Sequence, residues 1–182
     1  SHLEYLRDWF ILFYETIRES EFILNISGDI GVTGTNAADI SRAQDISRRR
    51  ISECIQVFRM YMPGCEDMYL ISTGSTLGIR ESRQIVGRYT ITKEDLMNRR
   101  QFPDAIARAC ALVGNHTADG KDAAFADITP GSSFYMPYGC MLPKNIEGLL
   151  VAGRCISVEH EAMGGTRIMP VCMGLGQAAG TA

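Results

Sequence analysis

The C-terminal residues carry the pattern with the clearest chemical use. Gly164 and Gly165 allow the backbone to pass close to a ligand or to take a positive φ. Pro170 follows where the first position of a helix is expected. Amides at residues 171–173 would point out of that helix N-terminus, which carries roughly +0.5 elementary charge. The arrangement predicts a seat for an anion.

A second group of chemically active side chains is Glu159, His160 and Glu161. Three adjacent residues cannot all face one ion in regular backbone, so we predict no metal site. His160 and Glu161 are candidate proton carriers in the active site, since histidine titrates near neutrality. An ordinary loop histidine is the alternative.

The spacing of apolar residues predicts the elements that position these groups. Helical periodicity runs over residues 3–20 and 39–62, and a loop-forming composition lies between them at 27–36. A Thr-x-x-Asp signal predicts Thr92 as the N-cap of a short helix. Another helix is expected over 103–113.

Strand-like segments flank the motif "GIRESR". Residues 68–76 and 84–92 are expected as strands, which would hold Arg80 and Arg83 on a rigid mount. A short aromatic strand is predicted over 134–138.

The rest of the C-terminal half reads as loops around one buried strand. Residues 114–131 are polar and loop-like. The apolar run 149–153 is typical of a strand covered on both faces in a parallel sheet. Residues 154–166 are expected as a loop, and a helix of small residues begins at Pro170.

Composition excludes several classes of protein. The chain has 182 residues, 46% of them hydrophobic, and a formal net charge of -3. It has no basic stripe, which argues against nucleic-acid binding, and no apolar run near the ~20 residues of a membrane span. Its six cysteines never fall in C-x-x-C spacing, so we expect buried free thiols rather than a cluster or a redox pair.

Three segments resemble a known family: "NIEGLLVAGRCIS", "GGTRIMPVCMGLGQAAGTA" and "GIRESRQIVGRYTITKEDL". They look like the C-terminal part of FAD-dependent oxidoreductases related to the fumarate reductase and succinate dehydrogenase flavoproteins. The resemblance runs from about Asp39 to Ala182 and implies FAD as the cofactor. The contacts that it implies are Gly153, Arg154, Ser157, Gly165, Pro170, Val171, Cys172 and Met173.

The resemblance also implies a substrate-binding arginine. Arg167 falls where fumarate reductases place the arginine that binds a substrate carboxylate, and a guanidinium fork suits a carboxylate. Two departures leave the substrate open: Arg154 replaces an acid, and Met169–Pro170 replaces a glycine pair. Arg80 and Arg83 are the second candidates for catalytic roles.

Each arginine also has a purely structural alternative. Arg167 could hold loop carbonyls or pair with Glu161. The arginines of "GIRESR" could pair with Glu81 or Asp95.

The predicted fold is α+β, with a mixed sheet and helices. Residues 1–147 are expected to form a substrate domain, and residues 148–182 a strand, loop and helix that complete an α/β FAD-binding domain. The G-x-G-x-x-G segment that binds the ADP pyrophosphate in such domains is absent from the chain. We therefore interpret the chain as the C-terminal piece of a larger enzyme.

The predicted function is hydride transfer between a small organic substrate and FAD, with arginines holding the substrate. The complete enzyme would be an FAD-dependent oxidoreductase, and the piece by itself inactive and prone to form homo-oligomers. The alternative is a non-catalytic binding module derived from a flavoprotein substrate domain. The sequence leaves the reaction direction, the electron acceptor and the compartment, cytoplasmic or periplasmic, open.

Overall fold

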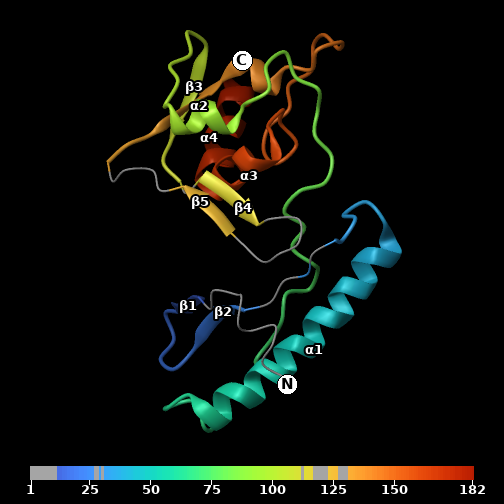
Figure 1. Cartoon of the computed structure of the whole chain (residues 1–182), viewed down its shortest axis with the longest axis vertical. Coiled ribbons are helices and arrows are strands. Elements are labelled where there is room, and N and C mark those ends of the chain that lie inside the picture. Colours follow the sequence, from blue (N-terminus) through green and yellow to red (C-terminus); the bar gives the residue numbers. More distant parts are fainter. Residues whose placement is uncertain (1–11, 27–28, 30, 112, 117–122, 127–130) are drawn as a thin grey trace. The chain divides into compact units, whose positions relative to one another are not determined.

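A computed structural model describes residues 12–26, 29, 31–111, 113–116, 123–126 and 131–182. The chain divides into two compact units, Ser1–Gly78 and Ile79–Ala182 (Figure 1). Helices and small antiparallel sheets occur together, which confirms the predicted α+β class. The described strands form three separate antiparallel pairs rather than one mixed sheet. None of the helices within these ranges is both long and apolar enough to cross a membrane.

The first unit is built from a hairpin and one long helix. Strand β1 (Leu12–Glu15) pairs antiparallel with β2 (Phe22–Asn25). Helix α1 (Ala37–Tyr61) begins at Asn36, whose side-chain oxygen accepts hydrogen bonds from the amides of the first helical turn. It ends just before Pro63, as the 39–62 pattern predicted.

Two predictions for the first unit are wrong. Residues 12–15 of the expected helix 3–20 form β1, because the backbone pairs with β2 and turns back through Ser20, which has φ 61°; residues 1–11 lie outside the described residues. Residues 68–76 form no regular strand, and the large apolar side chains at 69–71 are exposed. The loop expected at 27–36 is confirmed over its described residues.

The second unit contains every predicted site residue. Antiparallel strands β3 (Ala105–Ala109) and β6 (Phe134–Pro137) form one pair, and β4 (Val113–His116) and β5 (Ala123–Ala126) form another. The helices are α2 (Lys93–Met97), the 3-10 helix η1 (Tyr138–Met141), α3 (His160–Thr166) and α4 (Met169–Thr181).

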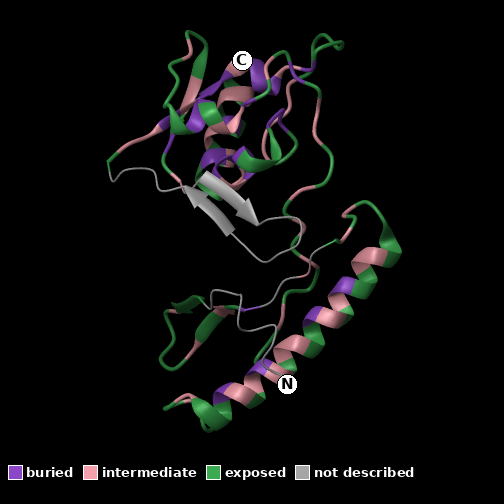
Figure 2. Cartoon of the chain, viewed as in Figure 1, coloured by how far each residue is buried: buried purple, intermediate pink, exposed green. Residues whose placement is uncertain are grey.

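One apolar core holds this second unit together. Helix α4 packs on β3, and a Cβ added at Gly174 would lie 3.5 Å from the Cβ of Ala107, so the small residue lets the helix lie close to the strand. Buried positions occur on α4, α3 and β6 (Figure 2). The core consists of Ile91, Leu96, Ala109, Phe134, Met136, Cys140, Met141, Ile156, Val158, Ala162, Met163, Val171 and Leu175.

The structure corrects the predicted elements around β3 to β5. The helix expected over 103–113 is absent from its described residues, because residues 105–109 pair with β6 and the cross-strand hydrogen bonds outweigh the helix propensity of their alanines. The expected loop 114–131 contains parts of β4 and β5, and residues 117–122 and 127–130 lie outside the described residues. The predicted aromatic strand is confirmed as β6.

Three further predictions are wrong: two expected strands lack regular pairing, and one expected loop contains a helix. Residues 84–92 form no continuous strand; they make two isolated bridges, Gly87 with Pro143 and Ile91 with Val158. Residues 149–153 form no strand; the amide of Val151 donates to the Met141 carbonyl at 3.0 Å. The expected loop 154–166 ends in α3.

Candidate functional site

Arg167 lies at the junction between α3 and α4. It is the C-cap of α3, and its amide donates to the carbonyl of Met163 at 3.1 Å. Ile168 is extended, with φ -66° and ψ 151°, and serves as the N-cap of α4. Pro170 follows in the first turn, where a missing N–H costs nothing, and this confirms the predicted start of the helix. The short break between the helices therefore fixes where Arg167 leaves the backbone.

Positively charged side chains outnumber negatively charged ones among the residues that act on Arg167. Its pKa is lowered, first by burial and then by repulsion from Arg80 and Arg154, while Glu81 acts in the opposite direction. Its Nε atom is buried and finds no hydrogen-bond partner among the described residues. The structure thus brings two of the predicted arginines, Arg80 and Arg154, close to the partly buried guanidinium group of a third, Arg167.

Arg154 links two segments that are distant in the sequence. Its guanidinium donates to the backbone carbonyl of Ile79, next to Arg80. Gly153, with φ 90°, makes the turn from which Arg154 projects, a conformation that residues with a Cβ rarely adopt. The hydrogen bond holds the "GIRESR" segment against the turn and adds a positive charge to the site.

Glu81 is a member of the site that the sequence analysis considered only as an ion-pair partner for arginine. Its Oε2 lies 2.6 Å from Nδ1 of His160, 79 positions later in the chain. Its Oε1 accepts a hydrogen bond from Gln84 Nε2 at 3.4 Å. The side-chain oxygen of Gln84, Oε1, accepts a hydrogen bond from the backbone amide of Val158. The only signal in the sequence is an acid between two arginines, which does not identify its partner.

The start of α4 presents both polar and apolar surface. Cys172 is half-buried, and its thiol donates to the Arg167 carbonyl at 3.3 Å. Burial raises the pKa of this thiol, while the charges of Arg154 and Arg167 act against that rise. Pro170 and Met173 are exposed, and Val171 is buried in the core.

The remaining predicted residues lie away from this convergence or are already engaged. Ser157 is only 3% exposed, and its hydroxyl is 2.8 Å from that of Thr90. Gly165 is buried within α3. Arg83 is exposed, and the contacts described above do not involve it.

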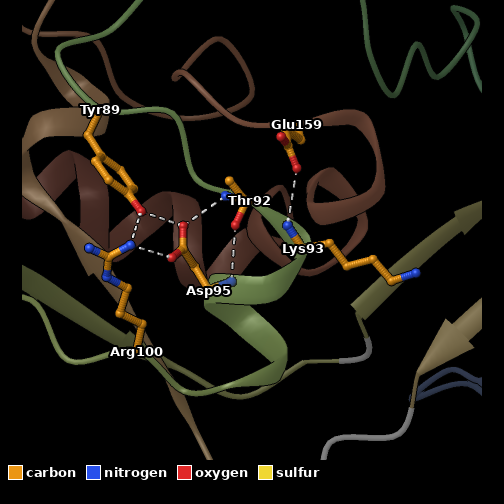
Figure 3. A network of polar contacts seen from close by, with 6 residues as sticks. All are labelled: Tyr89, Thr92, Lys93, Asp95, Arg100 and Glu159. Carbon is orange, nitrogen blue, oxygen red and sulfur yellow. Dashed lines mark hydrogen bonds and ion pairs between the residues drawn. The ribbon is translucent and has the colours of Figure 1, made fainter.

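A second polar cluster in the same unit is centred on the Asp95 carboxylate (Figure 3). Asp95 accepts from the Tyr89 hydroxyl at 2.6 Å and from Arg100 at 3.1 Å, and it forms the predicted capping box with Thr92. Burial and the Asp95 carboxylate raise the pKa of Tyr89 to about 12, so the hydroxyl remains a donor. Asp95 therefore pairs with Arg100, and Glu81 with His160.

One of the comparisons with known proteins confirms that the chain resembles FAD-dependent oxidoreductases, and it does not address the relation to fumarate reductases. No curated protein and no solved structure matches the chain. The sequence model of the family described as FAD dependent oxidoreductase matches residues 2–182. The chain therefore belongs to the FAD-dependent oxidoreductase family.

Proposed function

We propose that this FAD-dependent oxidoreductase binds an anionic group of a small organic substrate, such as a carboxylate, through Arg167 with the help of Arg80. Hydride then passes between that substrate and the cofactor. Arg83, which is exposed on the same segment, is the weaker candidate for the second contact. The proposal names the class of the substrate by its charge and leaves its carbon skeleton open.

The observation that carries the proposal is the state of Arg167. A structural arginine is normally surrounded by acceptors, whereas the Nε of this one is buried without a partner among the described residues. Two further guanidinium groups repel it, and one carboxylate attracts it. Gathering like charges around a partly buried cation costs free energy, and a bound anion would offset that cost. The arrangement is therefore better suited to an anionic ligand than to a role in packing.

The same residues fit FAD, which supplies hydride acceptance or donation when it is bound. The cofactor offers anionic groups to a cationic site, and the exposed side chains of Met169 and Met173 offer apolar contact beside Arg167 and Arg154. The exposed residues in the first turn of α4 and the turn at Gly153 would line the cofactor, whereas Gly165 is buried within α3. Ser157 does not fit this lining, because its hydroxyl contacts Thr90 and its backbone amide and carbonyl bond to Cys140 and Ile91.

This assignment extends to the organisation of the chain. We propose that residues 148–182 contribute one edge of the FAD site and that residues 1–147 belong to the substrate side. In this assignment, Arg80 from the first range meets Arg154 and Arg167 from the second, and all three lie within the compact unit Ile79–Ala182.

The test is a titration of the purified, FAD-loaded protein with acetate, L-lactate and L-malate, followed by the visible absorption of the flavin. We expect at least one carboxylate to perturb the spectrum of the wild type. Arg167→Met should bind it roughly 10- to 100-fold more weakly, the equivalent of a lost charge-assisted hydrogen bond of about 1.5–3 kcal/mol. Arg48→Met, at an exposed position of α1, is the matched control and should bind like the wild type.

Two outcomes would contradict the proposal. If the complete enzyme, of which this chain is proposed to be a part, remains colourless with added FAD, the assignment of the cofactor site is overturned. A flavoprotein whose Arg167→Met variant binds the carboxylates as tightly as Arg48→Met would overturn the role of Arg167.

A further inference from the structure

We propose that Glu81 is a positioning residue that holds His160 in one tautomer, so that Nε2 of the imidazole exchanges a proton with the substrate bound at Arg167. This inference rests on the proposed function and deepens it by adding the group that handles the proton. It assigns Glu81, a side chain for which the motifs suggested only a salt bridge.

The direction of the hydrogen bond follows from the chemistry of its two partners. Glu81 Oε2 and His160 Nδ1 are 2.6 Å apart. An ionised carboxylate can only accept hydrogen bonds, so Nδ1 must carry the hydrogen. In neutral imidazole the other nitrogen, Nε2, is then the basic atom. A carboxylate that fixes a histidine in this way is the usual support for a histidine that accepts protons.

The carboxylate is itself held in place. The Gln84 side chain donates to Glu81 Oε1 at 3.4 Å. Its own Oε1 accepts a hydrogen bond from the backbone amide of Val158, two residues before His160. The chain of contacts thus returns to the segment that leads into α3. The imidazole is anchored at both its backbone and its Nδ1, although its side chain is 55% exposed.

His160 and Arg167 lie on the same side of α3. They are seven positions apart, close to two helical turns, so their side chains leave the helix in nearly the same direction about 10 Å apart along the axis. Glu81 connects them, because it bonds to His160 and attracts Arg167. A small organic acid held by Arg167 would therefore lie along the face that His160 occupies.

Two further acids flank His160 in the sequence, Glu159 and Glu161. Glu159 precedes it and accepts from the Lys93 amide at 3.3 Å. Glu161 follows it and is exposed. Of the two neighbours in sequence, neither provides the contact to Nδ1 that Glu81 makes.

The proposed step balances for a substrate that carries a hydroxyl group. The carbon loses its hydrogen with both electrons as hydride, which FAD accepts, and the hydroxyl loses its proton to His160 Nε2, leaving a C=O bond. In the opposite direction, the imidazolium returns the proton to the carbonyl oxygen as hydride arrives at the carbon. Glu81 stays ionised in both directions and stabilises the imidazolium.

The experiment is a nitrogen-15 NMR measurement of the histidine side chains in the FAD-loaded protein. His160→Gln identifies the signals of His160 among the three histidines of the chain. At a pH where the ring is neutral, we expect Nδ1 to be protonated and Nε2 to be bare in the wild type. Glu81→Gln should lose this preference, because a glutamine amide can both donate and accept. Glu161→Gln removes the same charge from the adjacent residue and should keep it.

A wild-type protein with the hydrogen on Nε2 would overturn the role of Glu81 while leaving the anion site intact. The same result would follow if Glu161→Gln changed the tautomer as much as Glu81→Gln.

A titration with acetate then separates the two proposals. If acetate perturbs both the flavin spectrum and the His160 Nε2 signal, and Arg167→Met abolishes both effects, the inference is supported. If the spectrum responds and Nε2 does not, His160 does not face the site and its proton role is wrong. If acetate, L-lactate and L-malate all leave the spectrum unchanged, the anion site itself is overturned, and the proton role with it.

Discussion

The buried carboxylate of Asp95 should be the most sensitive polar position in the second unit, and Asp95→Asn tests this. The side chain is 4% exposed and accepts hydrogen bonds from Tyr89, from the Thr92 amide and from Arg100. Asparagine keeps one carbonyl oxygen but turns an amide N–H toward a donor. The bond to Arg100 contributes little, since that arginine is 56% exposed.

The expected loss comes from the other two bonds. A hydrogen bond to a charged group contributes about 1.5–3 kcal/mol, and the two are not additive. We therefore expect Asp95→Asn to lower the free energy of unfolding by about 2–3 kcal/mol. The control is Glu94→Gln, an exposed acid in the same helical turn, which should cost less than about 1 kcal/mol through the helix dipole.

The assay is native-state hydrogen exchange on peptides from residues 79–182, which reports the opening free energy of this unit by itself. The pH dependence gives a second readout. Burial opposes ionisation of Asp95, but its hydrogen bonds outweigh burial and lower its pKa below the usual value. Its contribution is therefore fully present above the unfolded pKa of about 3.9 and is lost as the pH falls through the folded pKa.

The difference between wild type and Asp95→Asn should accordingly be constant near neutrality and shrink below about pH 4. The reasoning fails if Asp95→Asn costs no more than Glu94→Gln, or if the difference grows as the pH falls.

Two further predictions concern packing and thiol reactivity. Gly87→Ala should destabilise the second unit by about 1–3 kcal/mol, because the new Cβ would lie 2.6 Å from the Cβ of Ser157 and 2.9 Å from a backbone oxygen. Gly176→Ala should instead stabilise α4 by about 0.5–1 kcal/mol, because the described residues outside its own helical backbone place no heavy atom within 4 Å of the new Cβ. Hydrogen exchange that gives the same change in opening free energy for Gly87→Ala and Gly176→Ala would contradict both predictions. Burial and the nearby Asp104 carboxylate raise the pKa of the Cys140 thiol to about 12. Iodoacetamide at pH 8 should therefore modify exposed Cys155 long before Cys140, as mass spectrometry of timed samples can check.

The elements that the sequence predicted well are those whose signals are local. Helix α1 follows from one continuous apolar stripe and an asparagine cap, α2 from a capping box, and α4 from a proline in its first turn. The predictions that are wrong concern segments whose conformation depends on hydrogen bonds to distant parts of the chain. Residues 105–109 become a strand because β6 is available to pair, and the apolar run 149–153 remains irregular with a backbone bond to Met141.

The site divides in the same way. Arg167 was predicted because a motif marks its position, and the structure places Arg80 and Arg154 beside it. Glu81 was not assigned to the site, because its contact with His160 joins segments 79 positions apart and no pattern within either segment reports the other. Single-sequence reasoning finds residues that chemistry marks locally and misses partnerships that only the fold creates.

The two polar clusters of the second unit show why the arginines, rather than Asp95, mark the site. Around Asp95, donors and acceptors match, so the cluster needs no further ligand and its value lies in stability. Around Arg167, cations outnumber the one nearby carboxylate, and a buried donor lacks an acceptor among the described residues. Such an arrangement stabilises the fold less than a matched one would. A ligand that brings the missing negative charge would offset this cost, which is why we propose that an anionic substrate or the cofactor binds at these arginines.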